Sequence, residues 1–378
     1  MDHEIAIIGT GIAGLAAATA VIMADRDCVL IGPPTPEMEG GVQLAPNGWF
    51  ALSALGLDKN VLSHATRLSE ITVRSLNNNA TLARLPLRGI YASVARADLA
   101  NVLVERIAQA DKIKRHDTII VEADQSDGCV NIICEDASLR KVRGLIAADG
   151  VSGFGRPHVT SQSEADIRVS LATNKLALRL MLHMSDLPTF FSQSSSNLWL
   201  GNGIHVVHYP IGTRVNFVVT MPKALAQTQW QSQCLKRNSP IHMLADPTLN
   251  WVATPLPRSG SSICWRRGNI VLAGDAAHVM PPHLAQGAGQ SLQDAACLMQ
   301  SLAQNVYVRD AFTAYARHRS GVVAKIAQKA EISGKIMAFS GIAGKMRNIA
   351  LDLGGNQLLQ DWLTEVWAID PGLSGEGS

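Results

Sequence analysis

Short apolar runs alternate with helical stretches through the first 165 residues of the chain. The segments 4–9, 15–23 and 28–31 read as a strand, an Ala-rich helix and a second strand. Further on, the pattern predicts helices at 47–55 and 98–109 and strands at 118–122, 130–134 and 144–148. Strands that alternate with helices predict a parallel sheet covered by helices.

The pattern changes between about 166 and 221. Strand-like stretches follow one another there without long helices, at 176–183, 197–200, 205–209 and 215–219. An earlier pair, 71–74 and 80–85, alternates like a hairpin around the Asn-rich turn 77–79. These segments predict a second, mostly antiparallel sheet laid over the first domain.

The last third of the chain returns to the first pattern. After a loop-rich stretch, 240–262, we expect a strand at 270–273 and long helices at 291–304 and 311–337. We expect a short tail to follow and to end in disorder at 372–378.

The segment 5–24 is almost uninterrupted apolar sequence, as in a membrane span or a signal peptide. However, three glycines break it at turn spacing, and the four residues before it are acidic rather than basic. We therefore expect a buried strand, a turn and a helix, and no transmembrane segment anywhere in the chain.

Composition narrows the class of protein. The chain has 378 residues, 47% of them apolar and 17% charged, which predicts a sizeable core. Its net charge of +2, with no basic run, argues against a nucleic-acid partner. The six cysteines show no metal-like spacing, so we expect no metal site, reduced thiols and a cytoplasmic location.

A glycine-rich turn follows the first strand, with the sequence Gly9-Thr10-Gly11-Ile12-Ala13-Gly14. Between a strand and a helix, this spacing is typical of a dinucleotide-binding loop. The acidic residue that normally ends the second strand and binds a ribose is replaced by Gly32. Either Glu37 or Glu39 reaches back to the ribose, or no carboxylate serves it.

A second nucleotide-type feature lies about 265 residues later, where the strand at 270–273 runs into Gly274 and Asp275. A carboxylate at a strand end can accept hydrogen bonds from sugar-like hydroxyls. The helix beginning near Gly287 presents free N–H groups to a ligand. Two such features, far apart in one chain, predict a single long ligand, FAD.

Together with Asp149-Gly150, these motifs resemble those of the FAD-dependent aromatic monooxygenases, the single-component flavoprotein hydroxylases. The likeness covers most of the chain and includes Arg96-Ala97-Asp98-Leu99 and the loop and helix from Gly40 to Leu57. Ala95 replaces a histidine and Gly153 replaces a serine that are often found in the family, and Gln43 replaces an active-site histidine of the 6-hydroxynicotinate hydroxylases. The chain looks most like the salicylate, 3-hydroxybenzoate and 6-hydroxynicotinate hydroxylases.

The resemblance implies that FAD is bound non-covalently, and that NADH or NADPH is a transient co-substrate. It also implies a set of cofactor-binding residues: Gly9, Gly11, Ile12, Ala13, Gly14, Val42, Gln43, Arg96, Asp149, Asp275, Pro282, Gly287 and Ala288. Asp149 and Arg156 would together serve both the flavin and the reduced nicotinamide.

The implied fold is α/β, with a Rossmann-like FAD-binding domain, an inserted antiparallel substrate domain and C-terminal helices. We expect the FAD-binding domain to comprise 1–70, 90–165 and 263–345. The substrate domain would comprise 71–89 and 166–262, and a tail would comprise 346–378.

The implied reaction begins when reduced flavin takes up O2 at C4a, and the distal oxygen is then transferred to a small aromatic substrate. A phenolic acid or a hydroxypyridine fits this chemistry. The resemblance places His205, Tyr209 and His283 at the active site, whereas a core position is the alternative for each. His278 is expected to be structural, and the orientation of His208 is open.

Two other functions remain open from the sequence. One is a polyprenyl-phenol hydroxylase of quinone biosynthesis, and the other is an FAD oxidoreductase that does not transfer oxygen. The oligomeric state is also open, with a homodimer as one expectation.

Overall fold

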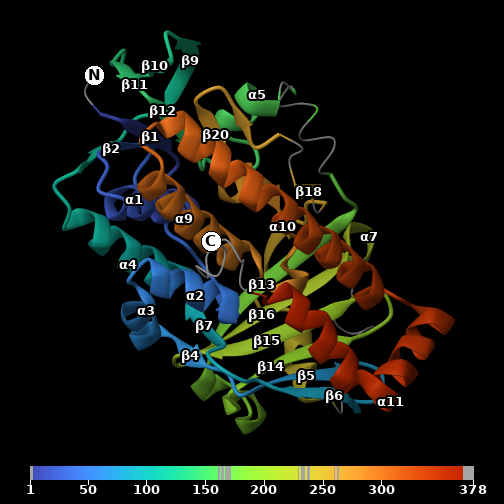
Figure 1. Cartoon of the computed structure of the whole chain (residues 1–378). Coiled ribbons are helices and arrows are strands. Elements are labelled where there is room, and N and C mark those ends of the chain that lie inside the picture. Colours follow the sequence, from blue (N-terminus) through green and yellow to red (C-terminus); the bar gives the residue numbers. More distant parts are fainter. Residues whose placement is uncertain are drawn as a thin grey trace.

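The computed structural model describes residues 3–160, 162, 166, 172–228, 230, 235, 239–258, 260–261 and 264–368. A six-stranded and a seven-stranded sheet form its framework. Figure 1 shows the two sheets in neighbouring parts of the molecule, with helix α10 (Val308–Met337) extending from one to the other.

The six-stranded sheet is parallel except at one edge, which confirms the predicted parallel sheet, but the strands expected at 118–122 and 130–134 lie in a separate antiparallel sheet. Its strand order is β19-β20-β12-β1-β2-β8, and only the β19–β20 pair is antiparallel. The strands are β1 (Ile5–Ile8), β2 (Cys28–Ile31), β8 (Ile113–His116), β12 (Gly144–Ala147), β19 (Arg266–Arg267) and β20 (Ile270–Leu272). Because β1, β12 and β20 run the same way, the loops that follow them meet at one edge of the sheet.

Helices cover this sheet and explain its fully apolar central strands. Helix α1 packs against α4 and α9, and α9 packs against α10. The helices of this domain are α1 (Ile12–Met23), α2 (Pro46–Ala54), α3 (Asp58–His64), α4 (Arg96–Ala108), α5 (Gly155–Thr160) and α9 (Gly287–Gln304).

The seven-stranded sheet has the order β17-β13-β16-β15-β14-β5-β6 and is antiparallel except between β14 and β5. Its strands are β5 (Glu70–Ser75), β6 (Thr81–Pro86), β13 (Lys175–His183), β14 (Ser195–Leu200), β15 (His205–Ile211), β16 (Arg214–Pro222) and β17 (Val252–Pro255). A core that includes Phe191, Trp199 and Phe217 forms on this sheet. The predicted second sheet is confirmed, together with the hairpin β5–β6.

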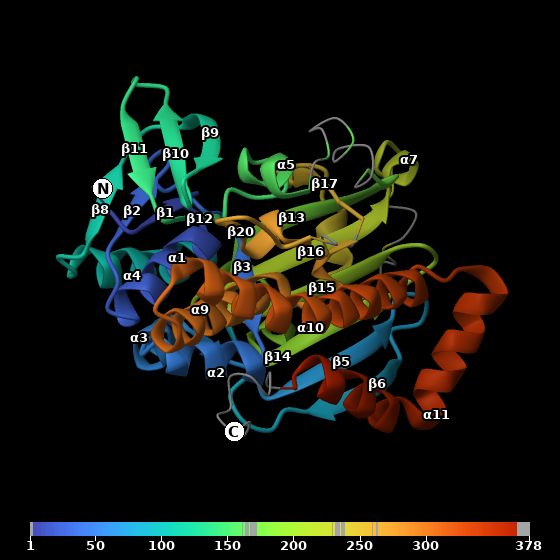
Figure 2. The same ribbon diagram turned by 45° about the horizontal axis from the view of Figure 1, so that its top comes forward.

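Three small sheets were not predicted. They are β9 (Ile120–Ser126) with β10 (Cys129–Cys134) and β11 (Leu139–Val142); β3 (Gly41–Leu44) with β4 (Thr66–Arg67) and β7 (Ala92–Ala95); and β18 (Gly260–Ser261) with β21 (His278–Val279). Figure 2 shows the first of them standing at the edge of the parallel-sheet domain. The remaining elements are helix α7 (Lys223–Ala226) and five 3-10 turns: Met184–Asp186, Thr189–Ser192, Pro240–Ala245, Gly274–Ala276 and Pro282–Leu284.

The segment after residue 345 differs from the expected tail. Helix α11 (Gly341–Val366) occupies most of it, with a kink at Gly354, and packs against β6. Its apolar residues lie on both the inner and the outer faces, so the sequence lacks the single apolar stripe that identifies a surface helix. The expected disorder at 372–378 lies outside the described residues.

The apolar segment 5–24 forms β1, the glycine turn and α1 within the core. Among the helices that the structure describes, none is long and apolar enough to cross a membrane.

Candidate active site

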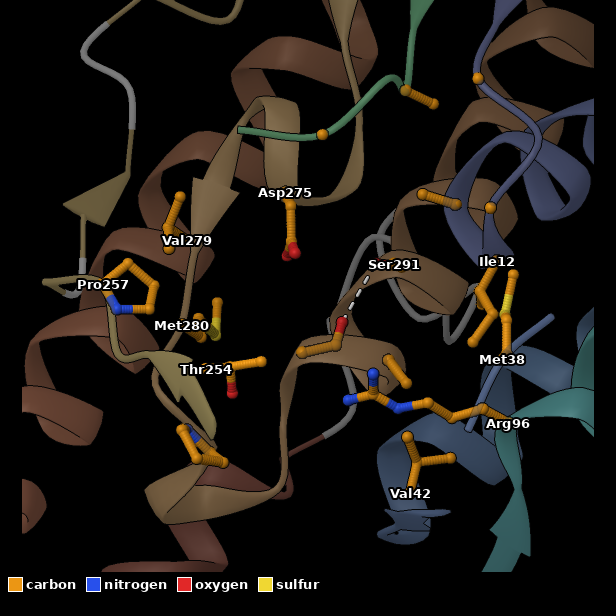
Figure 3. Close-up of a pocket in the computed structure, with 18 of the residues that line it drawn as sticks. Ile12, Met38, Val42, Arg96, Thr254, Pro257, Asp275, Val279, Met280 and Ser291 are labelled. Carbon is orange, nitrogen blue, oxygen red and sulfur yellow. Dashed lines mark hydrogen bonds between the residues drawn. The ribbon is translucent and has the colours of Figure 1, made fainter. Parts of the chain in front are cut away.

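A cavity of about 950 Å³ lies where the loop edge of the parallel sheet meets one face of the seven-stranded sheet. Its walls include the loops after β1, β2, β12 and β20 and side chains of β13, β15 and β16. Every site residue expected from the sequence lines it except Gly14 and Arg156. Figure 3 shows the Asp275 carboxylate and the Arg96 side chain entering this space from different walls.

The turn between β1 and α1 has the close packing that its glycines predict. Gly9 has a φ of 103°, and a Cβ there would lie 2.4 Å from the Ala148 carbonyl oxygen. A Cβ on Gly14 would lie 1.8 Å from the Gly9 carbonyl oxygen, so Gly14 serves packing rather than the cavity. Gly11 has open space around it, and no side chain caps α1. The N-terminal N–H groups of α1 are thus available to an anion such as a pyrophosphate.

The end of β2 explains the missing acidic residue. Gly32 has a φ of 158°, and a Cβ there would lie only 3.0 Å from the methyl group of Thr10. A larger residue is therefore disfavoured at this position. Glu37 and Glu39 are exposed, and neither is among the residues that line the cavity, although Met38 is. Of the two alternatives, the geometry favours a ribose site without a carboxylate.

Asp149 lies in the loop after β12 and retains spare hydrogen-bonding capacity. Its Oδ2 accepts a hydrogen bond of 2.9 Å from the Gly155 N–H, whereas its buried Oδ1 has no partner among the described residues. Burial raises the pKa of Asp149 to about 6. A Cβ on Gly153 would lie 2.2 Å from the carboxyl carbon, which explains why glycine replaces serine there.

Arg156 lies near this loop and is only 5% exposed. Its Nε and Nη1 have no hydrogen-bond partner among the described residues, and burial lowers its pKa. Asp149 therefore offers the site a carboxylate oxygen that a ligand can satisfy, whereas the expected ligand role of Arg156 has no support from the cavity, which Arg156 does not line.

Asp275 lies in the turn after β20, and its side chain is open to the cavity. The surrounding protein atoms raise the pKa of Asp275, while His278, Arg96 and Arg156 act in the opposite direction. No residue that the structure describes donates a hydrogen bond to its carboxylate. This carboxylate can accept hydrogen bonds from ligand hydroxyls.

The loop before α9 and the first two residues of the helix, Gly287 and Ala288, line the cavity. Ala285 adopts a left-handed conformation with a φ of 53°, and no side chain caps the helix. Behind this loop, the side-chain oxygen Oε1 of Gln286 accepts hydrogen bonds of 2.9 Å from Asn47 and from Gln290. These contacts hold the helix start in place.

Asp294 anchors the same region from further along α9. Its carboxylate accepts hydrogen bonds from the Gly274 N–H (2.9 Å), His278 Nε2 (2.7 Å) and Arg319 Nε (2.8 Å). Burial raises the pKa of Asp294, but His278 and Arg319 outweigh it and lower the pKa overall. His278 is structural, as expected. Asp294 and Arg319 were not predicted from the sequence, where their only signal is a charged residue on the apolar face of each helix.

The side chains expected to serve catalysis come together. The ring centroids of His205 and His283 are 5.2 Å apart, at an interplanar angle of 62°. Burial lowers the pKa of His205 well below its usual value and that of His283 to about 4. Both rings are therefore neutral at pH 7. Gly334 on α10 leaves the room for His283, because a Cβ there would lie 2.4 Å from its ring.

Tyr209 lines the cavity beside Val207, on the same face of β15 as His205. Its hydroxyl donates a hydrogen bond of 3.0 Å to the Gly41 carbonyl oxygen, and burial raises its pKa to about 12. Tyr209 thus ties the seven-stranded sheet to β3. His208 points to the opposite face, among Phe191, Trp199 and other aromatic rings.

The cavity residues that were not foreseen include Arg179, Thr220, Thr254 and Met337. Arg179 has the clearest signal in retrospect, because it interrupts a strand that is otherwise largely apolar.

Comparisons with known proteins agree with this architecture. Residues 2–330 match the family model described as FAD binding domain. The chain is 30% identical over 321 residues to a 3-amino-4-hydroxybenzoate 2-monooxygenase of Streptomyces platensis, covering 77% of each chain. It is 26% identical over 374 residues to a 3-hydroxybenzoate 6-hydroxylase of Polaromonas naphthalenivorans, covering 92% of this chain and 91% of that one.

Among solved structures, Klebsiella pneumoniae HpxO complexed with FAD and uric acid superposes with a TM-score of 0.81 at 20% identity, covering 97% of each chain. This likeness shows the fold. The match to the family model extends from the first glycine motif through Asp275 and α9. The chain belongs to the family of FAD-dependent aromatic monooxygenases.

Proposed function

We propose that this protein hydroxylates a small phenolic acid or a hydroxypyridine-type substrate, using NADH or NADPH and O2. The observation that carries this proposal is the single cavity that joins the nucleotide-type loops to the face bearing His205 and Tyr209. The relatives named above act on hydroxybenzoates, which supports the substrate class.

The described residues fit FAD. The uncapped start of α1 suits the pyrophosphate, and Asp275 suits the ribityl hydroxyls. Arg96 would approach the phosphate–ribityl portion, and Gly287 and Ala288 would offer N–H groups to the ring system. Bound FAD supplies the oxygen chemistry once reduced by the nicotinamide co-substrate.

The residues beside the substrate would manage its proton and exclude water. A neutral imidazole at His205 can accept or relay the proton of a ring hydroxyl as oxygen is transferred. His283 extends this path, since its ring lies against that of His205. Tyr209 stays protonated and holds β3 against the sheet, which keeps the substrate space closed.

The test uses His205→Ala and Tyr209→Phe, with His318→Ala as the control because His318 is exposed on α10. Purified enzyme is screened with hydroxylated aromatic acids and pyridines. NAD(P)H consumption, peroxide and product are all measured. We expect the two variants to oxidise NAD(P)H but to release peroxide, with product formation by His205→Ala lower by about 10²- to 10⁴-fold. Coupled hydroxylation at the rate of the control would contradict these roles.

We also propose a homodimer formed through the first half of α11. Ile342, Met346, Ile349 and Leu353 are 59–83% exposed and recur at helical spacing on its outer face. The exposed Lys345 and Asp352 lie seven residues apart beside this row, so antiparallel pairing of two copies would set opposite charges together. Sedimentation of the protein and of Leu353→Lys tests this, since only the unmodified chain should dimerise. A monomeric unmodified chain would contradict it.

We keep a cytoplasmic location as part of the proposal, from the cysteine spacing alone.

A further inference from the structure

Arg179 lies on the face of the seven-stranded sheet that forms the floor of the cavity. Arg179 on β13 is paired with Val218 on β16, which in turn is paired with Val207 on β15. The next row of the same face contains His205, Thr220 and Thr254. Two strand spacings, about 10 Å, therefore separate Arg179 from the strand that carries His205 and Tyr209.

The Arg179 guanidinium lacks a carboxylate partner within the described part of the chain. Its Nη1 donates a hydrogen bond to the Thr254 hydroxyl, a neutral group. Burial lowers the pKa of Arg179, and the positive charge of Arg96 lowers it further. A partly buried cation in this setting has lost hydration without gaining an opposite charge.

A ligand with a negative charge would supply what is missing. The planar guanidinium group suits a carboxylate, because it can donate two parallel hydrogen bonds to the two oxygens. The Thr254 contact holds one side of the guanidinium and so orients the group.

Resting on the proposed function, we infer that Arg179 is the anchor for a carboxylate of the aromatic substrate. The carboxylate binds at Arg179 on β13, and the ring extends over Val218 and Val207 toward His205. Arg179 thereby determines specificity, because it selects aromatic acids over neutral phenols and fixes which ring carbon approaches the flavin.

The test compares Arg179→Gln with the unmodified holoenzyme. Arg214→Gln is the matched control, because Arg214 lies on the same sheet and is exposed outside the cavity. Each protein is titrated with hydroxybenzoates and hydroxypyridine carboxylates and with the corresponding carboxamides, while the flavin absorbance reports binding.

The unmodified enzyme is expected to bind at least one acid more tightly than its amide. Arg179→Gln should weaken binding of the acid about 10- to 100-fold, the loss expected for a charge-assisted hydrogen bond. The affinities for the amide and for FAD should be unchanged. Arg179→Lys should recover only part of the loss, because an ammonium group cannot form the two parallel bonds.

Other outcomes would overturn the inference. If the affinities for acid and amide fell equally, Arg179 would have a structural role. Weaker FAD binding or a higher KM for NAD(P)H would instead assign Arg179 to a cofactor site. The inference would also be contradicted if the unmodified enzyme bound no acid more tightly than the corresponding amide. An enzyme that hydroxylates neutral phenols would refute the anchor but leave the proposed function intact.

Discussion

Gly334 determines where the His283 ring can lie. A Cβ at residue 334 would come within 2.4 Å of the ring, whereas a Cβ at Gly321 on the same helix would meet nothing within 4 Å. His283 in turn lies against His205, so a glycine on α10 controls the geometry of both histidines.

Gly334→Ala is expected to displace His283 and to uncouple hydroxylation from NAD(P)H oxidation, with FAD content unchanged. Gly321→Ala is the control, and it should keep full coupling and gain about 0.4–1 kcal/mol of stability. The ratio of product to NAD(P)H consumed checks both. Normal coupling in Gly334→Ala would show that the ring position is not critical.

At the scale of elements, the start of α9 is held by a buried polar network rather than by a capping side chain. Asp294 links α9 to the Gly274 turn, to His278 and, through Arg319, to α10. Gln290 and Gln286 continue the network to Asn47 on α2. The two segments expected to contact FAD, Asp275 and Gly287–Ala288, are thereby fixed relative to each other.

Asp294→Asn should lower the free energy of unfolding by about 3–5 kcal/mol, because it leaves Arg319 buried without its charged partner. It should also weaken FAD retention. Asp310→Asn, at an exposed position in the first turn of α10, should cost less than about 1 kcal/mol. Thermal unfolding and flavin fluorescence measure both effects. Equal stability of the two variants would contradict the role of the network.

The sequence predicted the elements with a strong local signal: the parallel strands, the glycine turn and the strands of the second sheet. The glycines and aspartates expected to bind the cofactor followed from motifs, because each motif is a short segment with its own conformational requirement. Arg179 and Asp294 did not follow, because their roles depend on contacts between strands and helices far apart in the sequence. Helix α11 was missed because apolar residues cover both of its faces.

For the whole molecule, three buried histidines link stability to pH. Burial lowers the pKa of His208 to about 3 and that of His283 to about 4, and it also lowers the pKa of His205. The unfolded chain takes up these protons below about pH 6.5, before the folded protein does. Their contribution to stability is therefore complete above that pH and is lost as the pH falls. Asp149, with a raised pKa, acts in the opposite direction between about 4 and 6.

The free energy of unfolding should consequently fall as the pH is lowered from 6.5 toward 4. His208 contributes up to about 1.4 kcal/mol per pH unit. His208 lies outside the cavity, so His208→Phe should flatten this dependence without changing FAD binding. Denaturant titrations at several pH values measure the slope. An equal slope in His208→Phe would show that the buried ring does not titrate as its surroundings predict.

The most direct test of the account is the fate of oxygen in a reaction with FAD-loaded enzyme, NAD(P)H, isotope-labelled O2 and a panel of hydroxylated aromatic acids. The account predicts a hydroxylated product that carries one labelled oxygen atom for each NAD(P)H consumed. It also predicts that Asp275→Ala loses this product together with bound flavin. Release of labelled peroxide with every aromatic unchanged, or normal turnover by Asp275→Ala, would contradict it.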